Sequence, residues 1–246
     1  MDLDRESTKV RVCLDAKAKF QNVSMNDALL KGKLEMPNIL GVLTQFRAGE
    51  IAYIGDLKKM FWQMKLHIND QKYHGVVFKG ETYVFTRVCF GEKASSPLAD
   101  ESMVRISKFG RNTHPEASKA LLNERYVDDL TGSGNDEKRI IKKRNQIVDL
   151  IGQFGFEVKE WFSNRVNVGT VVDYKTVLGC KWNVKEDTIS LKISEKKLNK
   201  ITKRAILSTL AEVWDPIGLT VGISIKGKLV LQSIVRLKMD WDEKNR

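Results

Sequence analysis

Three aspartates lie at the ends of short apolar segments, where their carboxylates could form a catalytic or metal-binding site. Asp56 follows the apolar run 51–55, and Asp128 and Asp129 are adjacent residues just before the glycine-rich stretch 131–134. Neighbouring residues of a regular strand point to opposite faces. Both carboxylates of the pair can therefore serve one site only where the chain turns sharply. The glycine-rich stretch is expected to supply that turn and a return strand.

The chemistry suited to three such carboxylates is magnesium binding. Mg²⁺ takes one or two carboxylates and completes its octahedron with water and substrate phosphates. Two such ions about 4 Å apart can activate an attacking hydroxyl and stabilise a leaving pyrophosphate. An Asp-Asp pair more commonly forms a turn or caps a helix, so the pair is weak support by itself. Asp56, upstream in a predicted strand, strengthens it.

The chain is strongly basic. Its 246 residues include 42 Lys and Arg against 31 Asp and Glu, a net charge of +11, and 42% are hydrophobic. This hydrophobic content supports a packed core and excludes a disordered or collagen-like chain. The length fits one large domain or two small ones. The charge favours an anionic partner, nucleic acid first and an anionic membrane second, although composition alone is equally compatible with a soluble basic protein.

Other kinds of metal site and location are not supported by the sequence. Cys13, Cys89 and Cys180 have neither metal-binding nor disulfide-framework spacing, and the three histidines form no ligand motif. Any metal would therefore be held by carboxylates. No apolar run approaches the ~20 residues that cross a bilayer, and the first residues lack the features of a secretory signal. We expect an intracellular protein that is not secreted and has no membrane partner.

Hydrophobic periodicity predicts helices and hairpins without a repeating strand–helix–strand order, which is typical of an α+β fold. Helices are expected over 40–46, 57–66, from a serine cap at 95–97 onward, and over 117–122, 136–154, 195–211 and 220–238. Strands are expected over 9–14 and 51–55, and hairpins should pair 76–78 with 83–88 and 177–184 with 188–193.

Several segments, in order along the chain, carry a resemblance to one family. They include VRVCLDAKAK (10–19), GDLKKMFWQMKL (55–66), VCFGEKASSP (88–97), YVDDLTGSG (126–134), LGCKW (178–182) and TKRAILSTLAEVWDPIGL (202–219). With these segments the chain resembles the reverse transcriptase of BEL/Pao-class retrotransposons. The resemblance extends from residue 9 to 243, nearly the whole chain.

This resemblance implies the right-hand polymerase fold of fingers, palm and thumb, with a palm made of an antiparallel sheet packed on helices. Residues 1–50 would be partial fingers, truncated at the N-terminal side. Residues 51–190 would form the palm with interleaved fingers elements, and residues 191–246 a thumb-like helical region. RNase H, protease and integrase would then lie elsewhere in a longer polyprotein.

The resemblance also implies roles for the acidic residues and for one aromatic residue. Asp56, Asp128 and Asp129 match the family's catalytic carboxylates, which hold two Mg²⁺ ions, with Mn²⁺ as a substitute. Phe61 matches the aromatic residue under the nucleotide sugar, which excludes a ribose 2′-hydroxyl. Without the resemblance, a phenylalanine at this spacing would be read as ordinary helix core.

Further residues match parts of the substrate pocket. Arg11 matches a fingers arginine that grips the incoming triphosphate, a task suited to a bidentate guanidinium; without the resemblance it would be a surface strand residue. Phe90 and Gly91 match the loop that shapes the nucleotide and template pocket. Tyr126 and Val127 match the pair that packs near the primer end.

A lysine-rich tract near the C-terminus could contact a nucleic-acid backbone. Lys196, Lys200 and Lys203 recur at i, i+4 and i+7, so a helix over 195–211 would place them on one face, with Arg204 beside them. A solvated lysine-rich face is an equally good reading of this pattern by itself. In a thumb helix, the same stripe would follow the phosphates of a primer–template duplex in a sequence-neutral, salt-sensitive contact.

The leading functional hypothesis is an RNA-directed DNA polymerase of a retrotransposon. Its partners would be an RNA or DNA template with a primer, deoxynucleoside triphosphates and the remaining polyprotein, in the cytoplasm or within virus-like particles there. One alternative is a catalytically inactive nucleic-acid-binding remnant, because Cys89, Glu92, Lys93 and Arg125 depart from the family pattern and could perturb the pocket. A two-metal nuclease would explain the acids but not Phe61 or LGCKW.

Overall fold

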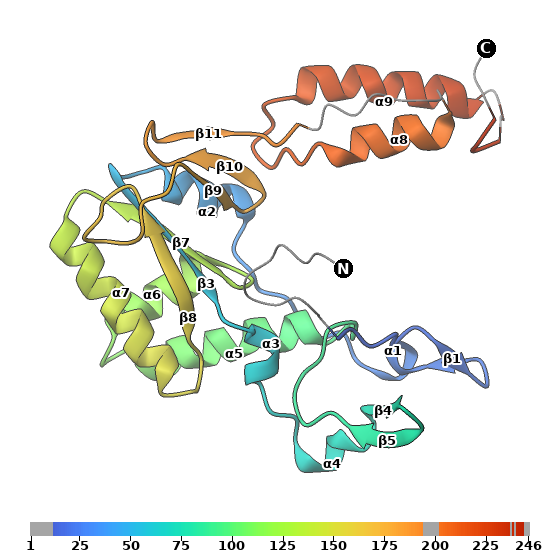
Figure 1. The fold of residues 1–246 in the computed structure, drawn as a ribbon, viewed down its shortest axis with the longest axis horizontal. Coiled ribbons are helices and arrows are strands. Elements are labelled where there is room, and N and C mark those ends of the chain that lie inside the picture. The colour runs from blue at the N-terminus through green and yellow to red at the C-terminus, as the bar shows by residue number, and fades with distance from the viewer. Residues whose placement is uncertain (1–11, 194–201, 237, 239, 244–246) are drawn as a thin grey trace.

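The structure is a computed structural model that describes residues 12–193, 202–236, 238 and 240–243. A four-stranded antiparallel sheet lies at its centre (Figure 1). The strand order is β6 (Arg125–Tyr126), β7 (Asp129–Gly134), β3 (Ile51–Leu57) and β8 (Val158–Ser163). β3 is inside the sheet and almost wholly buried, which explains why its sequence reads as a continuous apolar run.

Three helices cover one face of this sheet: α5 (Ser95–Gly110), α6 (Pro115–Asn123) and α7 (Glu137–Gly152). Alternate β3 residues, Tyr53 and Leu57, point into this layer and pack with Met103, Ile147 and other buried apolar side chains. α7 forms because its apolar residues recur at helical spacing and the Asp136 side chain caps its first turn by accepting from the Arg139 N–H.

The opposite face is covered by α2 (Ile39–Phe46) and by a three-stranded meander. The meander consists of β9 (Tyr174–Val177), β10 (Cys180–Asn183) and β11 (Thr188–Ser190). Ile54 of β3 packs here with Phe46 and Trp182, both fully buried.

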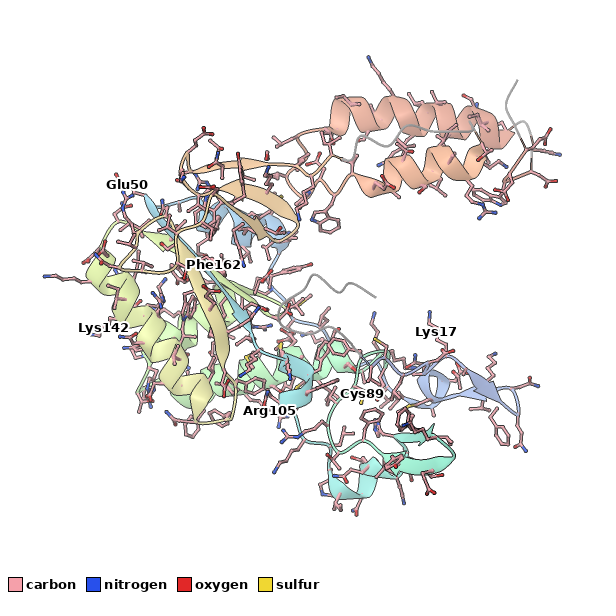
Figure 2. The ribbon with its side chains drawn as sticks, in the orientation of Figure 1. Lys17, Glu50, Cys89, Arg105, Lys142 and Phe162 are labelled. Atoms are coloured by element: carbon pink, nitrogen blue, oxygen red, sulfur yellow. The ribbon has the colours of Figure 1, made fainter. Side chains whose placement is uncertain are left out.

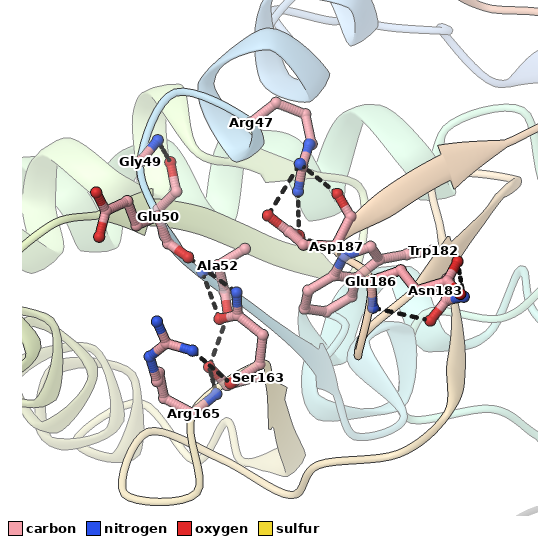
Figure 3. Close-up of polar contacts among 12 residues, drawn as sticks. Arg47, Gly49, Glu50, Ala52, Ser163, Arg165, Trp182, Asn183, Glu186 and Asp187 are labelled. Atoms are coloured by element: carbon pink, nitrogen blue, oxygen red, sulfur yellow. Dashed lines mark hydrogen bonds and ion pairs between the residues drawn. The ribbon is translucent and has the colours of Figure 1, made fainter.

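A polar contact attaches the meander to α2 (Figure 3). The Arg47 guanidinium, just after α2, forms an ion pair with Asp187 and also donates to the Asp187 carbonyl at 2.6 Å. The Trp182 indole N–H donates to the same carboxylate at 2.9 Å. Asp187 therefore fixes the turn between β10 and β11 against the helix.

Two parts of the chain project from the same side of the central layers (Figure 1). One is the helix pair α8 (Lys203–Glu212) and α9 (Val221–Arg236). The other contains the remaining short elements, which are β1 (Lys19–Phe20), β2 (Val23–Ser24), α1 (Met25–Ala28), α4 (Ile68–Gln71), β4 (Gly75–Phe78) and β5 (Glu81–Val84). Among the described residues, no helix combines the length and apolarity needed to cross a membrane.

The structure confirms a mixed helix-and-sheet fold and the helices expected over 40–46, 117–122, 136–154 and 220–238. The hairpin expected around 76–88 is present as β4 and β5, joined by a two-residue turn at Lys79 and Gly80. The strand expected over 51–55 continues through Asp56 to Leu57, so Asp56 lies inside β3 rather than after it.

Five expectations about local structure are wrong in detail. The helix expected over 57–66 shrinks to α3 (Met60–Gln63), because the Leu57 N–H is used by the sheet and Lys59 adopts φ +51°. Ala94 caps α5 instead of a serine, since the Ser95 hydroxyl donates to the Cys89 carbonyl. The described part of 9–14 forms only a single bridge, between Cys13 and Phe90.

The fourth and fifth differences concern the C-terminal third. The segment expected as one strand over 177–184 bends at Leu178 and Gly179, both with positive φ, and so forms two strands of the meander. The helix expected over 195–211 begins only at Lys203, because Thr202 is extended and its side chain caps the helix. Lys196 and Lys200, the other lysines of the expected stripe, lie outside the described residues.

Candidate metal and nucleotide site

The sheet register brings two of the three predicted carboxylate residues together. Asp56 of β3 is paired directly with Asp129 of β7. Asp128 occupies the two-residue turn between β6 and β7, and its carbonyl accepts from the Leu57 N–H at 2.8 Å. The chain turns sharply at Val127 and Asp128 themselves, and the glycine-rich stretch forms the return strand.

The local backbone beside Asp56 is irregular. β8 carries an extra residue relative to β3 between the pairs Gly55–Trp161 and Leu57–Val158. Gly55 is required there, because a Cβ on it would meet the Trp161 ring at 2.7 Å. Bulges of this kind commonly lie next to active sites, where they redirect side chains.

The acidic residues repel one another electrostatically. The pKa of Asp129 is raised to about 7, first by burial and then by the negative charges of Asp128 and Asp56. Lys175 of β9 acts in the opposite direction on Asp129. Such a group of carboxylates is expected to gain from a bound cation, since a cation offsets both the burial of charge and the mutual repulsion.

The donor chemistry of Asp56, Asp128 and Asp129 fits Mg²⁺, which prefers carboxylate oxygens together with water and phosphate. Within the described residues, no three His, Cys, Asp or Glu side chains already form a complete metal site. The backbone places the three aspartates at neighbouring positions.

A cavity of about 400 Å³ opens beside these carboxylates. Asp56 and Asp128 line it together with Phe61, Phe90 and Lys159. The Phe61 ring meets the Phe90 ring edge to face, with centroids 4.8 Å apart. Aromatic rings, two carboxylates and three lysines thus border one space, which suits a ligand with both an apolar body and phosphates.

Gly91 follows Phe90, and its backbone conformation shapes this wall of the cavity. Its φ is +104°, and a Cβ there would lie 1.9 Å from the Leu14 carbonyl oxygen, so only glycine fits. The Leu14 N–H donates to the Phe90 carbonyl at 2.8 Å. The segment after residue 11 therefore packs against the Phe90–Gly91 loop, while Arg11 itself lies outside the described residues.

A second hollow borders the other side of the turn. Tyr126, Val127 and Asp129 line it, opposite the Leu178–Gly179 turn and Trp214. The Trp214 indole N–H donates to the Leu178 carbonyl at 3.0 Å, which joins the meander to the segment after α8. The segment LGCKW, noted in the sequence, thus lies across from YVDD.

The described members of the basic tract are engaged with the C-terminal residues. The Arg204 guanidinium pairs with both oxygens of Asp242, at 2.8 and 3.0 Å. Lys203 is buried, and its ammonium lies 5.1 Å from the centroid of the Trp241 ring. Neither side chain presents an unengaged charge to a nucleic acid in this arrangement.

Two residues near the site were missed or misjudged from the sequence. The Lys175 ammonium lies 3.4 Å from the centroid of the ring of Phe162, a β8 residue labelled in Figure 2. Phe162 pairs with Ile54 of β3, so it faces the same side of the sheet as Asp56. Arg125 was expected to perturb the pocket, yet it is buried and paired with Asp100 at 2.5 Å. No local sequence signal identifies either, because both contacts join segments far apart in the chain.

Comparisons with known proteins point to retroelements. Residues 202–246 match the family described as the Pao retrotransposon-like RNaseH-like domain. The chain is 26% identical over 153 residues to the genome polyproteins of two isolates of Petunia vein clearing virus, Shepherd and Hohn. That match covers 62% of this chain and 6% of each polyprotein, so the chain spans a small part of these relatives.

Solved structures share the fold. The foamy viral protease-reverse transcriptase dRH in complex with ds DNA superimposes with a TM-score of 0.62 at 18% identity, over 82% of this chain and 32% of that one. The foamy viral protease-reverse transcriptase in complex with an RNA/DNA hybrid gives 0.57 at 17% identity, over 80% and 26%.

These findings also bear on the C-terminal region. The stretch interpreted from the sequence as thumb-like carries the RNaseH-like match, whereas RNase H was expected elsewhere in a polyprotein. The chain is therefore related to retroelement polyproteins, and it shares the mixed α/β fold of the foamy viral protease-reverse transcriptase chains.

Proposed function

We propose that this chain is the RNA-directed DNA polymerase region of a retrotransposon polyprotein. The observation that carries the proposal is the pairing of Asp56 with Asp129, with Asp128 on the adjoining turn and Phe61 in the same cavity as Asp56 and Asp128. A two-metal polymerase needs carboxylates beside a pocket for a nucleotide, and this cavity has that combination. The net charge of +11 suits a nucleic-acid partner.

In the proposed reaction, the primer 3′-hydroxyl oxygen bonds to the α-phosphorus of a deoxynucleoside triphosphate as the bond to pyrophosphate breaks. Asp56 and Asp128 would hold two Mg²⁺ ions, with Asp129 assisting. Such ions would supply activation of the hydroxyl and charge neutralisation at the leaving pyrophosphate. Phe61 and Lys159 both line the cavity, and in this reaction Phe61 would lie under the sugar and Lys159 would contact the phosphates. Positioning and electrostatics supply most of the rate.

The regional assignments belong to the same proposal. Residues 1–50 would contribute to the fingers, residues 51–190 to the palm with interleaved fingers elements, and residues 191–246 to a thumb. The two parts that project from the same side of the central layers support this arrangement (Figure 1). Template with primer, deoxynucleotides and the other polyprotein enzymes are the proposed partners, and the cytoplasm is the proposed location.

An RNase H-like nuclease is the second candidate, because residues 202–246 match that domain family. In the described part of that stretch, however, the carboxylates have other roles. Asp215 accepts from the backbone of Gly218 to Thr220, and Asp242 pairs with Arg204. These carboxylates hold the α8–α9 connection and the C-terminal segment together, which favours the polymerase reading of the Asp56 site.

An inactive remnant is less well supported than a polymerase. Two of the departures that suggested it are accommodated without loss of a metal ligand. Arg125 has the Asp100 carboxylate as its partner, and the Glu92 carboxylate lies 2.8 Å from the His74 ring in a buried pair. Both residues thus contribute to packing around the site.

The test is primer extension on an RNA template with Mg²⁺ and deoxynucleotides. We expect extension by the wild-type chain, loss of at least 100-fold with Asp128→Asn, and wild-type activity with Asp70→Asn, an exposed aspartate on α4. Equal signal from wild type and Asp128→Asn, or none from either, would overturn the polymerase proposal. Shortened strands in the same assay would favour the nuclease.

A further inference from the structure

Arg125 is among the largest fully buried side chains of the described residues. It lies on β6, directly before the segment that carries Tyr126 to Asp129. Its guanidinium pairs with Asp100 of α5 at 2.5 Å, and the side chains are 1% and 4% exposed. A charge buried this deeply requires several partners, so each contact of the guanidinium is informative.

Three elements meet at this guanidinium. Nε donates to the Leu121 carbonyl at 3.2 Å, Nη1 to the Val127 carbonyl at 3.1 Å, and Nη2 to Asp100 Oδ1. The other Asp100 oxygen accepts from the Glu35 N–H at 2.8 Å. The planar, multidentate guanidinium can make these bonds together, which a lysine ammonium cannot reproduce.

The turn that Arg125 holds is strained. Val127 has φ +54°, a region unfavourable for a β-branched residue, and such strain costs about 1–3 kcal/mol. It persists only when surrounding contacts determine it. The bond from Arg125 to the Val127 carbonyl is one such contact, and the bond from the Leu57 N–H to the Asp128 carbonyl is another.

Stability alone does not explain the pair. A buried ion pair is often replaceable by apolar side chains at little or no cost in stability. What apolar side chains cannot supply is a donor aimed at the Val127 carbonyl. The carbonyl that accepts this bond belongs to Val127, one residue before Asp128, which indicates a role in the geometry of the carboxylate.

We propose that Arg125 is a positioning residue: it holds the Val127–Asp128 turn in its strained form, so that Asp128 stays beside Asp56, and Asp100 fixes the guanidinium for this task. The effect on metal binding and catalysis rests on the proposed polymerase function. The effect on the turn itself does not.

The test compares two variants with the wild-type chain. Asp100→Leu/Arg125→Met removes both charges, so neither partner is left buried and unpaired. Arg125→Lys keeps the charge and loses the multidentate contact. Arg47→Met/Asp187→Asn is the control, because it removes an ion pair on the other face of the sheet.

Amide hydrogen exchange followed by NMR is the primary readout. We expect the Leu57 amide, which reports the bond to the Asp128 carbonyl, to exchange at least tenfold faster in the double variant and in Arg125→Lys. The Ser163 amide, bonded to Thr170 at 3.1 Å in β8, should keep its wild-type rate in every variant. Mn²⁺ affinity measured by calorimetry should fall at least tenfold in parallel. If the double variant does not fold, the Leu57 exchange rate of Arg125→Lys is compared with that of the wild-type chain instead.

Unchanged Leu57 exchange in the folded variants would overturn the positioning role. A wild-type chain that neither binds Mn²⁺ nor extends primers, while its Leu57 exchange responds to the variants, would overturn the polymerase proposal alone. Wild-type extension with normal kcat in both variants would leave the polymerase proposal intact and overturn the role of Arg125 in catalysis.

Discussion

Asp56 on β3 and Asp129 on β7 are direct partners across the central sheet, and the turn carrying Asp128 is bonded to β3 one residue further on. Opposed like charges destabilise a strand pair, and here a third carboxylate adjoins them. Repulsion between these carboxylates therefore destabilises this end of the sheet. A cation that binds the carboxylates would relieve that cost.

The first prediction concerns pH and Asp129. Its pKa is about 7 in the folded chain and close to 3.8 when unfolded, so the folded state binds more protons between these values. The free energy of unfolding of the metal-free protein should then fall as pH rises from 4 to 7, by at most about 1.4 kcal/mol per pH unit. Asp129→Asn should remove this dependence. Thermal unfolding in EDTA, from pH 5 to 8, measures both.

Bound Mg²⁺ should offset this loss of stability over the same pH range. Because protons compete with the ion, Mg²⁺ should raise the unfolding temperature at pH 8 and have little effect at pH 5. Asp70→Asn on α4 should behave as wild type in both series. If Asp129→Asn and wild type show the same pH slope in EDTA, the raised pKa is not the cause of the dependence.

The second prediction concerns Phe61. Its ring borders the cavity and packs edge to face against Phe90. Phe61→Ala opens space beside the nucleotide sugar, so the ratio of ribonucleotide to deoxynucleotide kcat/KM should rise roughly tenfold or more. Phe154→Ala is the control, since it removes another edge-to-face ring, paired with Phe109 at 5.2 Å, from a different part of the protein. An unchanged ratio in Phe61→Ala would assign the ring to packing alone.

Much of the helix content could be predicted because its cause is local. α2 and α7 have apolar residues at helical spacing, and each buries that stripe against the sheet. The helix expected over 57–66 failed for a non-local reason: β3 continues through Leu57, whose N–H bonds to the Asp128 carbonyl 71 positions later in the sequence numbering. Tertiary pairing overrode an apolar pattern that fits a helix.

The sequence predicted the acidic residues of the candidate site, but not the basic residues that pack around them. Asp56, Asp128 and Asp129 could be selected by residue type and by motif, and the sheet brings them together. Arg125 was interpreted as a departure that could perturb the pocket, because its partner Asp100 is 25 residues away and no local signal shows that the helix carrying Asp100 packs against β6. The same holds for Lys175, whose position over Phe162 depends on how the meander crosses the sheet.

The third prediction concerns a buried network under the sheet. The Lys143 ammonium contacts both oxygens of Glu124, at 2.9 and 2.8 Å, and the Tyr53 hydroxyl donates to the same carboxylate. Lys143→Met leaves the Glu124 charge buried without its cation, which should cost about 3–5 kcal/mol of unfolding free energy. Urea unfolding measures this cost.

The matched control is the neighbouring Lys142→Met. Lys142 is exposed on α7, so its loss should change the free energy of unfolding by less than about 0.5 kcal/mol. Adding Glu124→Gln to Lys143→Met should restore part of the loss, because it removes the unpaired charge. Equal costs for the two lysine variants would mean that the Glu124 pair contributes nothing specific.

The last prediction concerns the basic tract and salt. Arg204 is paired with Asp242 and Lys203 is buried beside Trp241, so Lys196 and Lys200 are the members of the tract expected to meet phosphates. Each phosphate contact contributes about 0.9 to the slope of log K against log salt concentration for duplex DNA. Lys196→Ala/Lys200→Ala should therefore flatten the slope by about 1.8, and Arg204→Ala should flatten it less. Fluorescence anisotropy with a labelled primer–template across a salt series measures the slopes.

Lys138→Ala/Lys142→Ala removes two exposed charges from α7 and serves as the control. If that pair flattens the slope as much, net charge rather than the tract determines binding.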